Sequence, residues 1–438
     1  MRHTLLYIIA LCLVLGTASC SRQEKDLFEK SAADRLHATE QAVRDNLTSA
    51  GNGWEMRYFP YPDLPGYALL AQFADNGTVK IAAKNSVSSN NTYQEEVSLW
   101  DMDGTQGCVL TFNSYNALFS IFADPLSDGV GYAGDYEFVV LKNETNTLYL
   151  KGKKHGAYVV FNRLSDTQNW KAYFDATDVI NNEIFTDNDG IDMTYWDGTK
   201  AISVVYEEGT FTYLEDAEEI IRSFLTTPNG VHFYSGMPLA NSTDNAKEFA
   251  MSADKQRLQT ADGKAYFKSN YTPASYFDYR LDNESRWLYE AEGTDAKTRA
   301  RVDSICNAAK ALGAEITDFA YEQLSNGGSM VASRSYGLRI TYTAEGKQFS
   351  GRINFYAGVD NDITFRYKSI DDDIKPLFTR LSGDQESVDG VAALFCSIFC
   401  DTFTPESYMG SALNLTQLKL NGKNSGSCIH IRAQRVIM

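Results

Sequence analysis

The spacing of apolar residues changes along the chain, and each spacing predicts a different element. Between residues 31 and 50, Leu36, Val43 and Leu47 recur at helical intervals and Gly51 follows them. An apolar stripe closed by glycine predicts a helix that ends at this point. Similar patterns predict helices at Glu215–Leu225 and at Asp295–Leu312.

Alternation with a period of two dominates the rest of the chain and predicts antiparallel hairpins. In "YALLAQFADNGTVKIAAK", starting at Tyr67, apolar residues alternate on both sides of Asn76-Gly77. Asn-Gly is a strong hairpin signal because both turn positions favour positive φ. Comparable stretches start at Asp135, Ala201 and Leu338. We therefore expect an α+β fold that is rich in antiparallel sheet, with hairpins, meanders and a few helices.

Two short matches suggest an internal repeat. "RDNLTSAGNGW" at Arg44 resembles "RSFLTTPNGV" at Arg222, and "FADNGTVKIAA" is loosely similar to "SADKQRLQTA". The offsets (222 − 44 = 178; 229 − 52 = 177) are nearly constant, so we expect two related modules, each a helix followed through Asn-Gly by a strand. The predicted division is a signal peptide at 1–19, a tether at 20–30, an N-terminal α+β module at 31–210 and a C-terminal α+β module at 211–438.

The first twenty residues read as an export signal. Leu5–Leu15 is apolar throughout but too short to span a bilayer, and small residues lead to Cys20. We predict that Cys20 is a lipid attachment site, with residues 20–30 as a polar lipidated tether to the outer membrane. In the alternative, Thr17-Ala18-Ser19 is an ordinary cleavage site and Cys20 is incidental.

Composition limits the partners and the chemistry. The net charge is −17, and removal of residues 1–19 takes away only Arg2, leaving −18, which argues against nucleic acid. Apart from Cys12 and Cys20, the number of cysteines is odd, so at least one of them is unpaired. Cys396 and Cys400 are spaced to share one face of a predicted helix, and we expect them to be core residues. The remaining histidines are scattered, so we expect no metal site, catalytic residue or cofactor.

Three other patterns have structural explanations that we prefer. Gly129, Gly131 and Gly134 satisfy GxGxxG but precede a strand, so a glycine-rich turn is expected. The acidic clusters at Asp187 and Asp371 are expected to be solvated turns rather than calcium sites. Five aromatic residues are candidates for a sugar-stacking platform or, as we prefer, for the core of a β fold: Tyr58, Tyr61, Trp100, Tyr195 and Trp196.

Several stretches together resemble a known family. "NGWEMRYFP", "VLTFNSYNALFSIFADP", "GYAGDYEFVVLKN" and "LKGKKHG", following Cys20, are similar to Bacteroidetes lipoproteins that carry a domain of unknown function. The resemblance implies an envelope protein encoded near SusC/SusD-type importers and zinc-binding metallopeptidases. In such lipoproteins an acidic cluster after the lipidated cysteine implies exposure on the cell surface, and Glu24 and Asp26, interrupted by Lys25, match that cluster in part.

Three functions are consistent with these observations. The first is a non-catalytic lipoprotein that serves capture and import of a polymer, either glycan or peptide, held to the membrane by its N-terminal lipid and working with an outer-membrane importer. The alternative is a hydrolase whose acidic pair assembles only in the fold. The third is a structural or adhesive envelope protein. If two modules lie side by side, the cleft between them is the first place to seek a ligand.

Overall fold

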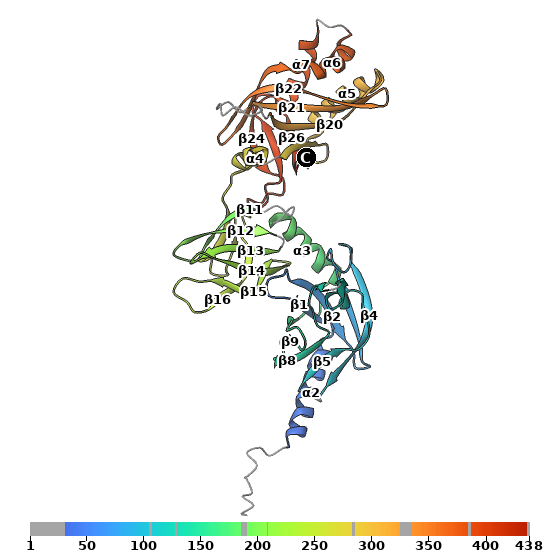
Figure 1. The fold of residues 1–438 in the computed structure, drawn as a ribbon, viewed down its shortest axis with the longest axis vertical. Coiled ribbons are helices and arrows are strands. Elements are labelled where there is room, and N and C mark those ends of the chain that lie inside the picture. Colours follow the sequence, from blue (N-terminus) through green and yellow to red (C-terminus); the bar gives the residue numbers. More distant parts are fainter. Residues whose placement is uncertain are drawn as a thin grey trace, which may run out of the picture.

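The computed structural model describes residues 31–104, 107–127, 129–184, 191–207, 209–282, 285–324, 335–383 and 387–435. Within these ranges the chain forms three closed, eight-stranded antiparallel barrels, each preceded by a helix. The barrels follow one another along the long axis of an elongated molecule, with α2 (Ala32–Ser49) at one end (Figure 1). The predicted α+β class, rich in antiparallel sheet, is confirmed.

The first barrel follows α2 and is a meander in which β1 and the last strand, β10, close the sheet. A short excursion between β5 and β8 holds η1 (Ser120–Phe122), β6 (Pro125–Ser127) and β7 (Val130–Gly131). The barrel strands are β1 (Trp54–Phe59), β2 (Tyr67–Phe73), β3 (Thr78–Ala83), β4 (Gln94–Asp103), β5 (Val109–Phe112), β8 (Glu137–Asn143), β9 (Thr147–Gly152) and β10 (Tyr158–Arg163).

The second barrel follows α3 (Trp170–Ile184), and its sheet closes between β11 and β18. Its strands are β11 (Ile191–Trp196), β12 (Ala201–Glu207), β13 (Thr210–Glu215), β14 (Glu218–Thr227), β15 (Gly230–Pro238), β16 (Asn245–Met251), β17 (Leu258–Gln259) and β18 (Tyr266–Ser269).

The third barrel follows α4 (Pro273–Asp282) and carries α5 (Ala296–Ala311), η2 (Asp372–Ile374), α6 (Lys375–Ser382) and α7 (Val388–Phe399) between its strands. Those strands are β19 (Ser285–Glu290), β20 (Ala314–Leu324), β21 (Ser335–Ala344), β22 (Lys347–Val359), β23 (Ile363–Ile370), β24 (Thr402–Ser407), β25 (Gln417–Gly422) and β26 (Cys428–Arg435).

The barrel interiors are filled with aromatic and aliphatic side chains. In the second barrel the ring of Phe267 stacks on Phe211 at 4.6 Å and on Phe233 at 5.8 Å, and all three residues are fully buried. An eight-stranded barrel has an interior just wide enough to be filled by its own side chains. These interiors are therefore packed cores, and the search for a ligand site moves to the outside of the barrels.

The first and third modules share a link between helix and barrel. The indole of Trp54 in β1 donates to the Leu47 carbonyl of α2 at 3.0 Å. The indole of Trp287 in β19 donates in the same way to the Phe277 carbonyl of α4 at 3.1 Å. Each tryptophan is fully buried, so the helix that precedes each barrel is part of that barrel's core.

Most of the predicted elements are present. The helix at 31–50 is α2, the helix at 295–312 is α5 with Asp295 as its N-cap, and the three hairpin stretches form paired strands. The Asn76-Gly77 hairpin joins β2 to β3, but only Gly77 has a positive φ. The hydrogen bond from Ala74 N to the Thr78 carbonyl leaves a loop of three residues, 75–77.

The predicted division into two modules is corrected. Residues 210 and 211 are neighbours within β13, so a boundary there would cut the second barrel, and the described chain forms three barrels. The predicted helix Glu215–Leu225 is wrong because this segment contains most of β14. Asn229-Gly230 joins β14 to β15, whereas Asn52-Gly53 follows a helix. The two matched segments therefore do not fold alike.

A loop of the third barrel completes the core of the second. Leu413, in the connection between β24 and β25, is 2 % exposed and packs into the hydrophobic cluster of the second barrel. The backbone holds it there, because Ala412 N donates to the Lys255 carbonyl at 3.0 Å. The side chain of Asn414 also donates to the Asn182 carbonyl at the end of α3. This contact joins the second and third barrels.

We expect Leu413→Ala to lower the free energy of unfolding by about 2–5 kcal/mol, the usual cost of truncating a buried leucine. Urea denaturation monitored by tryptophan fluorescence measures the change. Leu394→Ala, which removes a half-exposed leucine from α7, is the matched control and should change stability by at most about 0.5 kcal/mol. Equal stability of the two variants would contradict the contact.

Candidate functional site

The first two barrels meet through the turn after β1 and the outer face of β14. Gly66 N donates to the Phe224 carbonyl at 3.0 Å, and the Ser223 hydroxyl donates to the Pro62 carbonyl at 2.6 Å. Gly66 is required at this approach, since a Cβ there would lie 2.5 Å from the ring of Phe59. Strand β14 of the second barrel thus binds the backbone of the loop that follows β1 in the first barrel.

Helix α3 belongs to both barrels. Asn169 begins it by accepting a hydrogen bond from Ala172 N at 2.8 Å, as an N-cap residue does. Its first turns bury Trp170 and Phe174 against the outer face of β2 and β3. Its last turns place Ile180 and Ile184 in the core of the second barrel. The helix therefore fixes the position of one barrel relative to the other.

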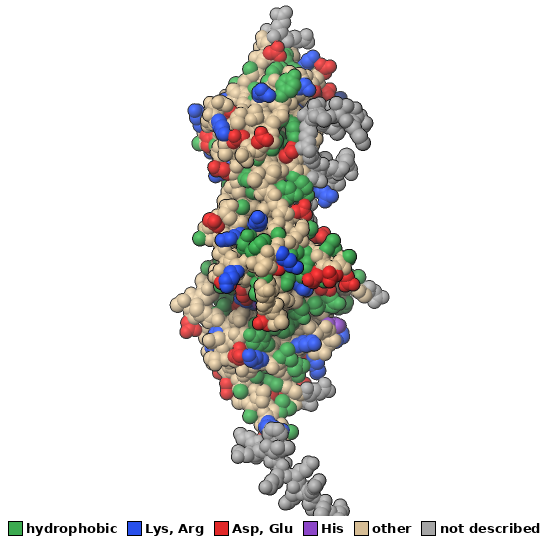
Figure 2. Space-filling view, turned by 90° about the vertical axis from the view of Figure 1, so that its left-hand side faces the viewer, with side chains coloured by type: hydrophobic (Ala, Val, Ile, Leu, Met, Phe, Trp, Pro, Cys, Tyr) green, Lys and Arg blue, Asp and Glu red, His purple; other side chains and the backbone are tan. Residues whose placement is uncertain are grey.

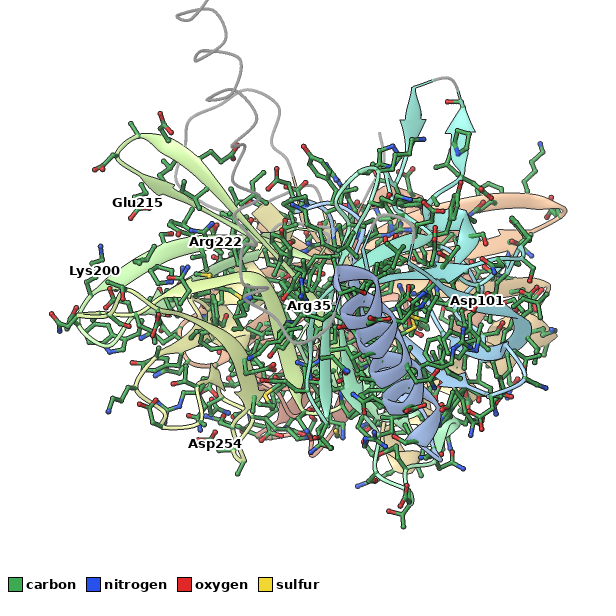
Figure 3. The ribbon with its side chains drawn as sticks, turned by 90° about the horizontal axis from the view of Figure 1, so that it is seen from below. Arg35, Asp101, Lys200, Glu215, Arg222 and Asp254 are labelled. Carbon is green, nitrogen blue, oxygen red and sulfur yellow. The ribbon has the colours of Figure 1, made fainter. Side chains whose placement is uncertain are left out.

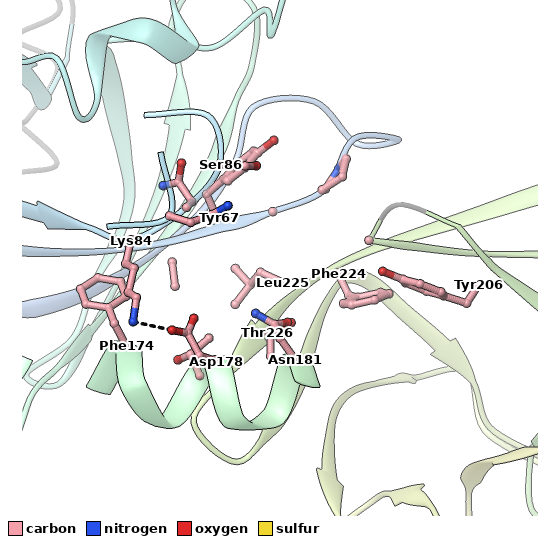
Figure 4. A pocket seen from close by; sticks show the side chains of 17 residues that line it. Tyr67, Lys84, Ser86, Phe174, Asp178, Asn181, Tyr206, Phe224, Leu225 and Thr226 are labelled. Carbon is pink, nitrogen blue, oxygen red and sulfur yellow. Dashed lines mark ion pairs between the residues drawn. The ribbon is translucent and has the colours of Figure 1, made fainter. Parts of the chain in front are cut away.

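A cleft of about 490 Å³ lies beside this junction, between β2, α3 and β14 (Figure 4). We call it the inter-barrel cleft. Aromatic residues of four different elements line it: Tyr67 of β2, Phe174 of α3, Tyr206 of β12 and Phe224 of β14. Tyr67 and Tyr206 are only partly buried. The cleft expected between two related modules depended on the two-module division corrected above, whereas this cleft lies between the first and second barrels.

The charged groups of the inter-barrel cleft neutralise one another. Lys84 and Asp178 are the charged residues in its lining, and they form an ion pair. Lys84 also contacts Asp175 Oδ1 at 3.0 Å, and the hydrogen bonds that its ammonium group donates to Asp178 and Asp175 raise the pKa of that group. The cleft thus has no unpaired charge in its lining to attract an ionic ligand.

Neutral hydrogen-bonding groups supply the rest of the polar lining. They are the side chains of Asn85, Ser86, Asn91, Thr177, Asn181 and Thr226. Burial raises the pKa of the Tyr67 hydroxyl to about 12, so it stays protonated and able to donate at neutral pH. Asn181 lies on the exposed side of α3, where its amide is accessible. Donors, acceptors and aromatic rings together suit a neutral, hydroxyl-rich ligand.

An ionic cluster holds the two barrels together at a second cavity of about 370 Å³. Arg57 of β1 donates to Glu55 Oε2 at 2.9 Å and to Glu248 Oε1 of β16 at 2.5 Å. Buried Glu55 also accepts hydrogen bonds from Tyr173 at 2.5 Å and from Asn162 at 3.0 Å. Both carboxylates are therefore occupied by donors from the protein.

His232 extends this cluster. Its Nδ1 lies 2.6 Å from Glu248 Oε1 and 3.0 Å from Arg57 Nη1, so the imidazole contacts both charged groups. Partial burial alone would raise the pKa of Glu248, but His232 and Arg57 outweigh it and hold that pKa below its usual 4.5. The side chain of Glu248 is 60 % exposed, so the attraction is screened by solvent.

The structure separates the aromatic residues that sequence suggested for a stacking platform. Tyr58, Trp100 and Tyr195 are buried inside barrels, whereas Tyr61 is exposed. The preferred interpretation, core residues of a β fold, is confirmed for these three. The residues of the inter-barrel cleft were not singled out, although Trp170, Phe174 and Ile184 on α3 show a helical spacing that would have revealed the helix.

The lipidation site, the glycine-rich turn and the acidic clusters were also predicted from the sequence. Cys20 and Asp187 lie outside the described residues. Gly134 sits in a glycine-rich turn before β8, where a Cβ would lie 2.2 Å from the Tyr58 hydroxyl. Asp371 is not a free solvated acid, because it accepts from Arg352 Nε at 2.8 Å and from the Asn354 amide.

No disulfide bond joins the cysteines of the described residues. Cys396 of α7 and Cys400, which follows it, pack against the core of the third barrel, as expected for core residues. Among the described residues, no group of three or more His, Cys, Asp or Glu side chains is arranged to hold a metal ion. In the same part of the chain, no helix is both long and apolar enough to span a bilayer.

The fold and the cleft define a class: a protein of tandem antiparallel barrels with a polar, aromatic-lined cleft between the first two. The chain belongs to the family described as Domain of unknown function (DUF4302), whose model matches residues 24–252. That match covers the first barrel, α3 and the second barrel through β16, and so includes the whole inter-barrel cleft. A search of curated proteins finds no match.

The ionic cluster predicts a pH dependence. A carboxylate whose pKa is lowered on folding stabilises the protein above its unfolded pKa, and this contribution is lost as pH falls through the folded value. We expect the urea midpoint to fall below pH 4.5, and Glu248→Gln to reduce that fall. Glu406→Gln, at an exposed position of β24, is the control and should follow the wild type. Parallel profiles for wild type and Glu248→Gln would refute the assignment.

Proposed function

We propose that this protein is a lipid-anchored lipoprotein of the outer membrane that captures a polymer without cleaving it. The inter-barrel cleft carries the proposal, because it combines partly buried aromatic rings with neutral amides and hydroxyls. Ligand sites favour such junctions between domains. A neutral glycan fits this lining, which has no unpaired charge, better than a peptide with ionic side chains.

The position of the barrels supports an anchored arrangement. The described chain begins at α2, at the end of the molecule farthest from the third barrel (Figure 1). A tether of residues 20–30 reaches at most about 35–40 Å when fully extended. With a lipid on Cys20, the first barrel lies nearest the membrane and the cleft stands one barrel farther out. We also propose that the protein is exposed at the cell surface.

We propose an outer-membrane importer of the SusC/SusD type as the partner, because the family that the sequence resembles is encoded near such importers. Importers of the SusC/SusD type handle captured nutrients at the outer membrane, and a lipoprotein beside them would deliver ligand. The net charge of −17 is compatible with anchoring through lipid rather than through attraction to anionic headgroups. No nucleic acid partner is proposed.

Binding is favoured over hydrolysis by the state of the carboxylates near the cleft. A glycosidase needs one carboxyl group to donate a proton and another to act as base or nucleophile. Glu55 and Glu248 flank one cavity, but Arg57 contacts both, and the pKa of Glu248 is lowered rather than raised. Asp178 is paired with Lys84. These groups are arranged to hold the barrels together rather than to transfer protons.

Lipidation of Cys20 has a direct test. We expect a fatty-acid analogue to label the wild-type protein during growth and not to label Cys20→Ala, because the thiol is the attachment atom. In-gel fluorescence after click chemistry measures the label. Cys108→Ala, which removes a buried thiol, should keep it. Label that persists in Cys20→Ala would show that the anchor lies elsewhere or is absent.

Ligand capture is tested on a glycan and peptide array followed by calorimetry. We expect a neutral oligosaccharide to bind, and Tyr206→Ala or Asn181→Ala to weaken it about tenfold, the effect of losing about 1.4 kcal/mol at a central contact. Tyr356→Ala, an exposed aromatic of β22 outside the cleft, is the matched control. Binding that survives both cleft variants would place the site elsewhere, and binding of peptides alone would reject the glycan.

A further inference from the structure

A further cavity lies on the third barrel, outside residues 24–252 and far from the inter-barrel cleft. Its volume is about 430 Å³, and it lies between the end of the β21–β22 hairpin and the segment formed by η2 and α6. These elements belong to the upper part of the molecule in Figure 1, at the end opposite α2. We call it the distal pocket.

The walls of the distal pocket are fixed by close packing. At Gly351 of β22 an added Cβ would lie 2.5 Å from Ile374 N, so the glycine allows η2 to lie directly against the strand. Ile374 and Leu377 are fully buried in the barrel core and hold η2 and α6 in place. The hairpin turns through Glu345 and Gly346, both with positive φ. Close packing thus fixes η2 and α6 against the barrel, and the β21–β22 hairpin forms the opposite wall of the pocket.

An aromatic pair forms one wall. Tyr342 and Phe349 are opposite one another on β21 and β22, and their rings stack at 5.4 Å with an angle of 22°. Tyr342 is buried, whereas Phe349 is 42 % exposed. Phe349 therefore presents apolar ring surface at the pocket, supported from beneath by Tyr342.

The acidic groups of the distal pocket exceed its basic groups. Arg380 pairs with Glu345 at 2.9 Å, and Asp372 pairs with Lys375 at 2.6 Å. Asp373, an exposed lining residue, forms no ion pair or hydrogen bond among the described residues. Tyr342, Asp373 and Arg380 all line this one cavity.

We propose that the distal pocket binds an organic cation, namely an alkylammonium or guanidinium group on an apolar stem. The cation would lie at the exposed ring of Phe349 and donate to the Asp373 carboxylate, combining a cation–π contact with a charge-assisted hydrogen bond. This ligand differs in charge from the one that fits the inter-barrel cleft. The two sites are independent, since they lie on different barrels.

Such a group has two sources, the side chain of a basic peptide and a free polyamine. The probes are therefore acetyl-Gly-Arg-Gly-amide and spermidine, added separately to the full chain at low salt and followed by calorimetry. We expect at least one probe to bind with a single site, and the affinity to fall about fivefold as ionic strength rises, because the contact is exposed. Tighter binding of the peptide identifies a side chain, and tighter binding of spermidine identifies a polyamine.

Two variants locate the site. Phe349→Ala and Asp373→Asn should each weaken the better probe at least fivefold. Tyr356→Ala and Asp360→Asn, exposed residues of the same barrel outside the pocket, should leave the affinity unchanged. Thermal unfolding verifies that all four variants remain folded. Failure of both probes to bind, or equal affinity of pocket and control variants, overturns the proposal, whereas glycan capture in the inter-barrel cleft is unaffected by either result.

Discussion

Closure of the sheets is the constraint on which the rest of this structure depends. Once eight strands close, every strand has two neighbours and no edge remains to bind another chain. The interior then has room only for its own side chains, as the stacked rings of Phe211 and Phe267 illustrate. Any ligand must bind outside the barrels or between them, and both candidate sites are found there.

The junctions follow from the same constraint. A closed barrel has two open ends and a curved outer face, and each must be covered where it is apolar. Helix α3 covers the outside of one barrel with Trp170 and enters the core of the next with Ile184. Phe59 packs near His232 and Tyr234 on the facing barrel. The inter-barrel cleft exists because two convex surfaces bridged by one helix leave a gap beside the contact.

The fold class was predictable because hairpin periodicity is a local property. Strands such as β2 and β3 could be located from their alternation, and α5 from its capping residues. Closure was not predictable, since pairing of β1 with β10 joins segments that no local pattern connects. Helix Glu215–Leu225 was mistaken because Glu218, Glu219 and Arg222 are spaced three and four residues apart, as charged residues are on a helix, although they stand in strand β14.

The correct repeat was present in the sequence at a different offset. "LYLKGKKHG" at Leu148 and "LKLNGKNSG" at Leu418 share Leu, Leu, Gly, Lys and Gly at positions 270 apart (418 − 148 and 426 − 156). Asp135 and Asp401 precede these hairpins, and each accepts backbone hydrogen bonds from the loop that follows. The inter-barrel cleft could not be predicted in this way, because its lining comes from α3 and from separate segments of two barrels, which meet only after both barrels have closed.

The position of Leu413 also has a consequence for how the chain matures. Barrel two is encoded by residues up to Ser269, but its hydrophobic core is completed by a residue near the C-terminus. A chain emerging from a ribosome or a translocation channel therefore exposes the unfinished end of that barrel until almost the whole protein has passed. The first barrel needs no such partner and can close early. Maturation would then proceed outward from the first barrel, and the second and third barrels would reach their final state together.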